Sequence, residues 1–157
     1  MTTRYFEDFV VGQVFEPSGR VRMEKDEIIA FAERYDPQPF NLDEEAARNS
    51  IFGRLVASGW HTAAVTMSLL ARSENRPVGG TIGLGFDELR WPMPVLPGDE
   101  LRIETEVLEM RSSKSRPDRG LMKMRTRTLN QHGQVVQEVI GIAMVPRRPT
   151  AGKIPGT

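Results

Sequence analysis

Cysteine is absent from the 157 residues of this chain. Without it there is no disulfide framework, no thiolate metal ligand and no thiol nucleophile. Histidine is scarce, with two residues, so we expect no transition-metal site. A chain without disulfides fits a reducing compartment, and we expect this protein to be cytoplasmic.

The chain also has no excess of either charge, because Lys+Arg and Asp+Glu both number 21. Nucleic-acid binding therefore has no global electrostatic support, and we expect no nucleic-acid partner. Basic residues do gather between positions 114 and 127. We interpret most of them as a solvated strand face and leave open a contact of some with a phosphate-bearing ligand. They are Lys114, Arg116, Arg119, Lys123, Arg125 and Arg127.

No apolar run is long enough to cross a membrane, since the longest, residues 139–145, has about the length of one strand. Residues 1–8 are too acidic and too poor in apolar side chains for a signal peptide. No repeat, linker or low-complexity segment divides the chain. We therefore predict a single domain over residues 1–148 and a flexible tail over residues 149–157.

Two helices are predicted in the first third of the chain. Apolar residues recur at helical spacing over residues 24–35, and Pro37 ends this amphipathic helix. Asp43 has the position of an N-cap for a short helix through Ala46 and Ala47. The recurring apolar positions of the first helix are Ile28, Phe31, Ala32 and Tyr35.

A more apolar helix is predicted from Gly59 onward, with Ser58 as its N-cap. A helix that is apolar nearly all round is buried, so we expect it at the centre of the domain. The small alanines on its main stripe would let a sheet approach closely. That stripe consists of Trp60, Ala63, Ala64, Met67, Leu70 and Ala71.

After Ser73 the hydrophobic period changes to two, which predicts antiparallel strands. Ile82, Leu84 and Phe86 are predicted to share one face of the first strand. The last strand is apolar on both faces from Val139 onward, which indicates either a central strand or a subunit interface. The strands are expected at residues 79–91, 101–107, 121–129 and 135–145, with one near 13–23 added to the sheet.

A single buried helix wrapped by a curved antiparallel sheet is an α+β architecture. Short motifs follow one another along nearly the whole chain, each weak alone but specific in order and spacing. They are Tyr5-Phe6-Glu7-Asp8-Phe9 with Val11-Gly12, Asp36-Pro37-Gln38-Pro39-Phe40, Phe52-Gly53, Ala57-Ser58-Gly59-Trp60-His61-Thr62-Ala63-Ala64, Asp87-Glu88-Leu89-Arg90-Trp91, Pro97-Gly98-Asp99 and Ser115-Arg116-Pro117-Asp118-Arg119-Gly120.

Through these motifs the chain resembles the MaoC-like dehydratases, which include the (R)-specific enoyl-CoA hydratases. The resemblance implies a hot-dog fold and a homodimer or higher homo-oligomer, with acyl-CoA pockets at the dimer interface. It implies a lyase that hydrates enoyl-CoA or dehydrates 3-hydroxyacyl-CoA. The CoA thioester is then the substrate, and no separate cofactor is expected.

In the family, an Asp and a His at the spacing Asp-x-x-x-x-His hold the reacting water, and a backbone N–H at the start of the central helix holds the thioester oxygen. Asp36 matches the carboxylate, although a loop aspartate before proline is also a common turn residue. Gly59, with Trp60, matches the helix-start amides, which are unpaired and electropositive. Ser58 belongs to the same segment, where its other role is that of an N-cap.

Asn41 stands where the family has its catalytic histidine. An amide can hydrogen-bond a water but cannot take its proton near neutral pH, and losing a general acid/base costs about 10²–10⁴-fold in rate. Three interpretations stay open: catalysis by Asp36 alone with Asn41 orienting water, a different reaction such as thioester hydrolysis, or non-catalytic acyl-CoA binding. His61, in the first turn of the helix, is an auxiliary candidate for the missing base or a polar residue bonded near the helix start.

Overall fold

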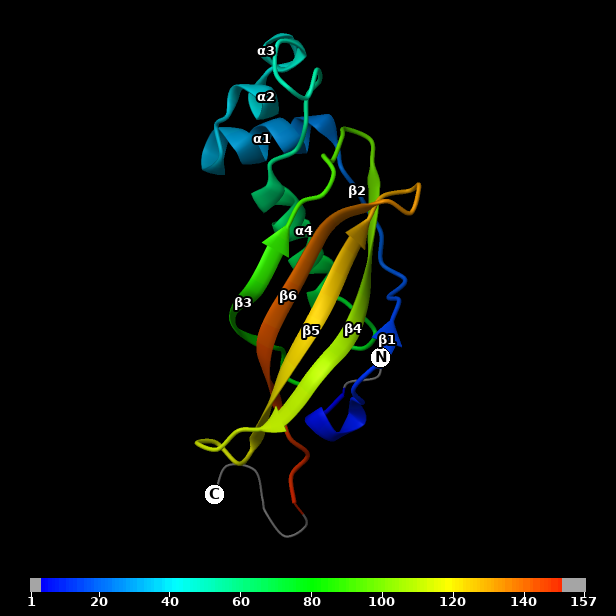
Figure 1. Ribbon diagram of the computed structural model, residues 1–157, viewed down its shortest axis with the longest axis vertical. Helices are drawn as coiled ribbons and strands as arrows, with labels where there is room; N and C mark the ends of the chain where they lie inside the picture. Colours follow the sequence, from blue (N-terminus) through cyan, green and yellow to red (C-terminus); the bar gives the residue numbers. More distant parts are fainter. Residues whose placement is uncertain (1–3, 151–157) are drawn as a thin grey trace.

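The computed structural model describes residues 4–150, in which helix α4 lies behind an antiparallel sheet and helices α1 to α3 gather beyond one end of it (Figure 1). The order of helices before long strands agrees with the α+β prediction. In chain order the elements are the 3-10 helix η1 (Phe6–Asp8), β1 (Val14–Phe15), β2 (Val21–Arg22), α1 (Lys25–Tyr35), α2 (Pro39–Leu42), α3 (Glu44–Arg48), α4 (Gly59–Ala71), β3 (Ile82–Arg90), β4 (Glu100–Ser112), β5 (Arg119–Leu129) and β6 (Val135–Pro146).

The sheet has the strand order β1-β4-β5-β6-β3, with β2 pairing a further part of β4. Every pairing is antiparallel. Because β6 lies between β5 and β3, its apolar stretch from Val139 onward belongs to a central strand. Strand β3 forms one edge of the sheet within residues 4–150.

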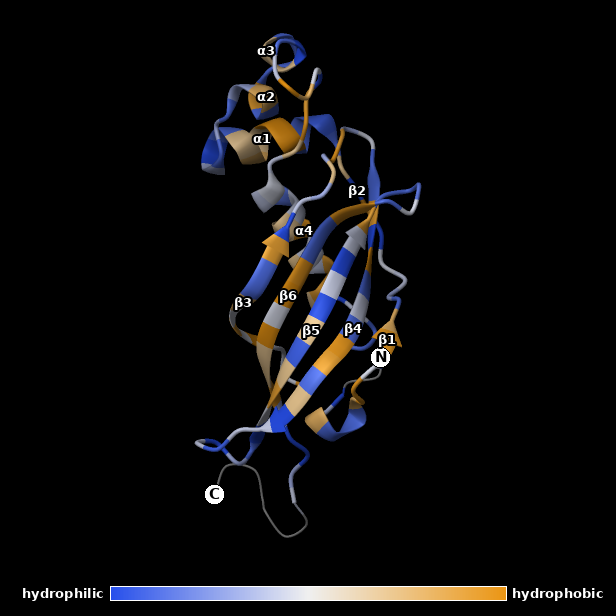
Figure 2. Cartoon of the chain, in the orientation of Figure 1, coloured by the Kyte–Doolittle hydropathy of each residue, from blue (hydrophilic) through white to orange (hydrophobic). Residues whose placement is uncertain are grey.

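The two faces of the sheet differ as the period of two predicts, and alternating bands of hydropathy cross the strands in Figure 2. On β4, Leu101, Ile103 and Val107 are buried beneath the sheet. On the outer face, Arg125 pairs with Glu106 at 3.1 Å and with Glu138 at 3.3 Å. Lys123 and Arg127 pair with carboxylates too, so this half of the basic cluster is a solvated strand face.

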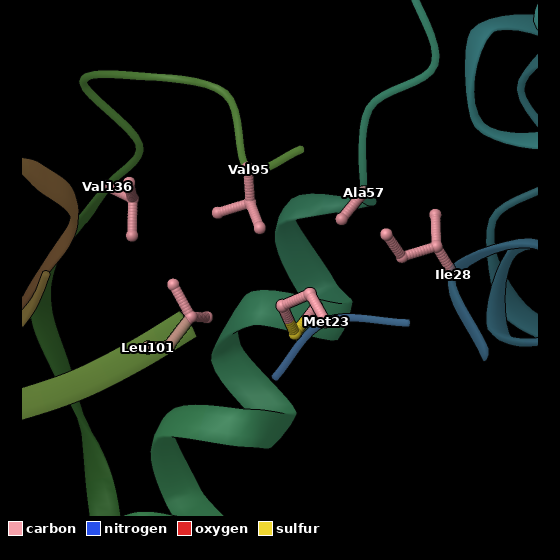
Figure 3. Packing of buried hydrophobic residues seen from close by; sticks show 6 residues of the cluster. All are labelled: Met23, Ile28, Ala57, Val95, Leu101 and Val136. Atoms are coloured by element: carbon pink, nitrogen blue, oxygen red, sulfur yellow. The ribbon is translucent and has the colours of Figure 1, made fainter. Parts of the chain in front are cut away.

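A core cluster closes the end of the sheet nearest the helices (Figure 3). Its side chains come from the segment before α1, from α1, from the segment before α4, from the loop after β3, and from β4 and β6. They point toward one another and connect the helical region to the sheet. The six buried residues are Met23, Ile28, Ala57, Val95, Leu101 and Val136.

Local capping sets the starts of the helices. The Asp43 carboxylate accepts hydrogen bonds from the Glu45 and Ala46 N–H groups, as predicted for an N-cap. The Ser58 hydroxyl accepts one from the Trp60 N–H in the same way. Immediately before α3, Pro39 begins the one-turn helix α2, which was not predicted from the sequence. A proline fits a first helical position because it needs no N–H partner.

The prediction for the buried stripe of α4 was wrong. Its buried residues are His61, Thr62, Thr66 and Leu69, whereas Trp60 and Met67 are exposed. The polar side faces the sheet because its hydroxyls find partners there: Thr66 Oγ1 lies 2.6 Å from Thr128 Oγ1 and donates to the Thr62 carbonyl. The apolar stripe is therefore left partly uncovered in the single chain.

The faces predicted for β3 were also wrong. Its pairing with β6 shifts register at Leu84 and again at Asp87, so that Ile82 lies opposite Met144 and Phe86 lies opposite Gly141. Residues that lie directly opposite each other on paired strands point to the same face of the sheet. Met144 and Gly141 are three residues apart on β6, so they point to opposite faces. Ile82 and Phe86 are consequently on different faces, because each bulge turns the rest of the strand over.

The C-terminal segment after β6 begins in contact with η1. Arg147 pairs with Glu7 at 2.9 Å and Arg148 pairs with Asp8 at 2.6 Å. Most of the predicted tail, residues 151–157, lies outside the described residues. In the part of the chain that the structure describes, we find no helix with the length and apolarity needed to span a bilayer.

Candidate functional site

The end of α1, helix α2 and the start of α4 surround a cavity of about 560 Å³. Asp36, Asn41, Ser58 and Gly59 all line it, so the fold brings together four of the six residues singled out in the sequence. The buried end of the cavity is formed by Val56, Ala57, Thr62, Val95 and Val136, and its exposed mouth by Gln38, Phe52, Trp91, Pro92 and Met93.

Asp36 is the C-cap of α1, where Pro37 prevents the helix from continuing. Its N–H closes the helix by donating to the Ala32 carbonyl at 2.9 Å. Its carboxylate turns toward α4 and accepts a hydrogen bond of 2.6 Å from the Ser58 hydroxyl. A single residue, Ser58, thus caps α4 with its oxygen and holds Asp36 with its proton.

The first turn of α4 faces the cavity with one free amide. The Trp60 N–H donates to Ser58 Oγ at 3.2 Å, and the His61 N–H donates to the Ser58 carbonyl at 3.0 Å. The Gly59 N–H meets no hydrogen-bond acceptor among residues 4–150. Since unpaired amides at a helix N-terminus favour negative charge, the Gly59 N–H suits an oxygen that gains charge during a reaction.

Asn41 and Thr62 are the most deeply buried polar residues of the cavity wall, each with 1% of its surface exposed. Asn41 is the one of the two singled out in the sequence. The one-turn helix α2 places it there, and its backbone N–H donates to the Gln38 carbonyl at 2.9 Å. Its side-chain Oδ1 is buried without a partner in the described chain. Leaving such an acceptor unpaired costs about 1–3 kcal/mol.

His61 is set apart from this group and does not line the cavity. Its ring stacks on Phe31 of α1, with centroids 4.7 Å apart and an interplanar angle of 7°. Burial lowers the His61 pKa below its ordinary value, and the nearby Glu27 charge partly opposes that shift. The ring therefore packs on an aromatic neighbour, but it does not make the bond expected near the helix start, because its Nδ1 is buried without a partner in the described chain.

Trp91 and Gln137 were not among the site residues predicted from the sequence. Trp91 lines the cavity at its mouth, and its indole N–H donates to Gln137 Oε1 at 2.9 Å across 46 residues of sequence. The run Trp91-Pro92-Met93-Pro94 was a visible signal, because two prolines forbid a regular strand there. Nothing in the local sequence of Gln137 pointed to the site.

Comparisons with known proteins identify the family. The MaoC-like domain family matches residues 8–127. The chain is 53% identical to the MaoC-like dehydratase from Rhodospirillum rubrum, whose crystal structure superposes with a TM-score of 0.88 over 94% of this chain and 99% of that one. It is 32% identical to the (R)-specific enoyl-CoA hydratase of Aeromonas caviae over 120 residues, 76% of this chain and 82% of the relative.

A third similarity concerns the fold. A conserved Mycobacterium tuberculosis protein with a double hot-dog fold superposes with a TM-score of 0.69 and 25% identity. The match covers 98% of this chain but 47% of that protein, so this chain corresponds to one of its two units. The chain belongs to the MaoC-like dehydratase family and has a hot-dog fold.

Proposed function

We propose that this protein is a hydro-lyase that adds water to enoyl-CoA thioesters, or removes it from 3-hydroxyacyl-CoA. The observation that carries the proposal is the position of the Asp36 carboxylate in the same cavity as the free Gly59 N–H, joined to that helix start through Ser58. A carboxylate and an oxyanion donor are the two groups that this addition needs.

The reaction can run on these groups with its atoms in balance. Asp36 takes a proton from water as the water oxygen bonds to the β-carbon of the enoyl group. The electrons of the double bond move toward the carbonyl, whose oxygen becomes enolate-like and accepts a hydrogen bond from the Gly59 N–H. Asp36 then returns the proton to the α-carbon. A carboxylate held by Ser58 keeps one oxygen oriented for both transfers.

Asn41 takes the place of the family histidine without taking its proton-transfer role. With its side-chain amide turned so that the oxygen faces the cavity, Asn41 can accept one O–H of the reacting water while Asp36 accepts the other. Holding the water between two acceptors aims a lone pair of its oxygen at the β-carbon. Asn41 in this proposal orients the water, and Asp36 alone carries the proton.

We further propose that the active form is a homodimer. The exposed side chains of β3 and α4 include Phe86, 62% exposed, and Met67, 54% exposed, on an edge strand and an uncovered helix face. A second copy of this chain is the occupant we infer, because a related chain about twice as long carries two hot-dog units. Pairing would cover these apolar side chains and the open edge of β3.

The experiment is hydration of a panel of trans-2-enoyl-CoAs by the wild type, Asp36→Ala and Asn41→His. We expect wild-type turnover, its loss in Asp36→Ala by about 10²–10⁴-fold or more, and a modest change in Asn41→His. Loss of absorbance by the enoyl thioester measures the rate directly.

Other outcomes would replace the proposal. A silent wild type that is thermally stabilised by acyl-CoA, with activity gained in Asn41→His, would identify an acyl-CoA-binding protein that has lost the reaction. Release of free CoA thiol would identify a thioesterase. Absence of both turnover and binding would remove acyl-CoA from consideration.

A further inference from the structure

The wall of the cavity that carries Trp91 is held by a chain of buried hydrogen bonds. The Trp91 indole N–H donates to Gln137 Oε1 at 2.9 Å, and Gln137 Nε2 donates to Thr66 Oγ1 at 3.1 Å. Thr66 in turn donates to the Thr62 carbonyl at 2.9 Å. Gln137 is 1% exposed. This chain connects the mouth of the cavity to the interior of α4.

The direction of every bond in this chain follows from its chemistry. An indole N–H can only donate, so the Gln137 oxygen must face Trp91 and its amide nitrogen must face Thr66. Thr66 Oγ1 accepts from Gln137 and also lies 2.6 Å from Thr128 Oγ1. Turning the Gln137 amide over would place its NH₂ group against the Trp91 N–H and leave both donors unpaired. The arrangement therefore holds the indole in one orientation.

Gly59 explains how close the indole comes to the proposed reaction centre. A Cβ atom built on Gly59 would lie 2.6–2.8 Å from three atoms of the Trp91 ring. Any side chain at position 59 would collide with the indole, which packs directly against the first turn of α4. Trp60 adds an edge-to-face contact with the same ring, at 5.4 Å between centroids.

We propose that Gln137 is a positioning residue, and that the Trp91 indole it fixes selects acyl groups without a substituent on the α-carbon. This inference rests on the proposed function, in which the thioester oxygen binds the Gly59 N–H. The carbonyl carbon that carries this oxygen is bonded to the α-carbon and to the thioester sulfur, and in this proposal the α-carbon is the neighbour on the side of the indole. A methyl branch there meets a ring that the hydrogen bond to Gln137 holds in place.

The kinetic experiment compares crotonyl-CoA with tiglyl-CoA, which differs by one methyl group on the α-carbon. One methylene in an apolar pocket is worth about 10–200-fold in kcat/KM, and we expect the wild type to prefer crotonyl-CoA by a factor in this range. Gln137→Leu and Trp91→Leu should each reduce that preference by about tenfold or more. For Gln137→Leu we expect this mainly through KM, because Asp36 and Gly59 stay in place.

Thr105→Val is the matched control. Thr105 Oγ1 lies 3.1 Å from Thr126 Oγ1 in another buried polar pair of the sheet, away from the cavity of Asp36. Its loss should leave the substrate preference unchanged. Trp91→Phe is a milder companion variant that keeps an aromatic ring but removes the N–H, and its preference should fall between those of the wild type and Trp91→Leu.

The orientation of the indole can be measured without turnover. The chain has two tryptophans, so Trp60→Phe leaves Trp91 as the single reporter. In that background Gln137→Leu should lower the fluorescence anisotropy of Trp91, and Thr105→Val should not. Quenching of the same emission gives the affinities of butyryl-CoA and 2-methylbutyryl-CoA, and Gln137→Leu should bring these two affinities closer together.

The kinetic and binding experiments distinguish the hydratase proposal from the proposal that Trp91 selects the acyl group. If the wild type hydrates no enoyl-CoA but the two saturated thioesters bind with different affinities that Gln137→Leu makes equal, the hydratase proposal fails and the selectivity proposal stands. If Gln137→Leu leaves the anisotropy and both preferences unchanged, Gln137 does not position Trp91. An equal change in Thr105→Val would show a general loss of rigidity and would also overturn the inference.

Discussion

Ser58 donates a hydrogen bond of 2.6 Å to Asp36 Oδ2, joining the end of α1 to the start of α4 across 22 residues of sequence. The same hydroxyl oxygen accepts the Trp60 N–H. One side chain therefore stabilises a helix and aims a carboxylate, and its two roles can be separated by experiment.

Ser58→Ala should lower both stability and turnover. Loss of the N-cap costs about 0.5–2 kcal/mol, and Asp36 loses the donor that orients its carboxylate. We expect kcat for enoyl-CoA hydration to fall, though less than in Asp36→Ala. Asp43→Ala is the control, since Asp43 caps α3 and does not line the cavity. It should cost similar stability in chemical denaturation with no matching loss of kcat. Equal kcat losses would contradict the role assigned to Ser58.

Gly59→Ala should destabilise the protein because the new methyl group would overlap the Trp91 ring. Overpacking of this kind costs about 1–3 kcal/mol, and relief by displacement of the indole would lower the affinity for acyl-CoA as well. Gly83→Ala on β3 is the matched control, because a Cβ there meets no atom within 4 Å. Urea denaturation of both variants measures the difference, which we expect to be at least about 1 kcal/mol.

His61 should make the protein less stable as the pH falls through the ordinary histidine range. Its pKa in the folded state is lowered from 6.5 by burial, whereas the unfolded chain protonates near that value. Between the two pKa values the unfolded state binds more protons, so the free energy of unfolding rises with pH. The contribution is full above pH 6.5 and is lost as the pH falls toward the folded pKa.

The test is the slope of unfolding free energy against pH between about pH 5 and 7. His61→Phe keeps an aromatic ring against Phe31 but cannot titrate, so its slope should be smaller than that of the wild type. A wild-type slope retained in His61→Phe would show that another group is responsible.

Met67→Lys should weaken the proposed homodimer. A charge on the exposed face of α4 would have to lose its hydration at the interface, and its burial there would be strongly unfavourable. Sedimentation should show a shift toward monomer that deepens on dilution. Ile51→Lys, which changes a residue 96% exposed in the loop after α3, should sediment as the wild type does. A dimer that tolerates Met67→Lys would place the interface elsewhere.

Sequence alone determined the features of this protein that depend on residues within a few positions of one another. The helical period over residues 24–35, the N-caps Asp43 and Ser58, and the alternation of β4 and β5 all follow from local geometry. The order of the short motifs was also sufficient to indicate the family, because that order is a property of the linear sequence and requires no knowledge of the fold.

Only the tertiary structure decided which distant groups meet. The polar side of α4 faces the sheet because Thr66 finds Thr128 and Gln137 there, 62 and 71 residues away. The bulges of β3 turn Phe86 to the other face, and no local pattern encodes a shift in pairing with β6. The contact of Trp91 with Gln137 arises in the same way. Hydrogen bonds between side chains that are distant in sequence depend on how the strands and helices pack. A short segment of sequence contains only one of the two bonded residues, so it cannot reveal the bond.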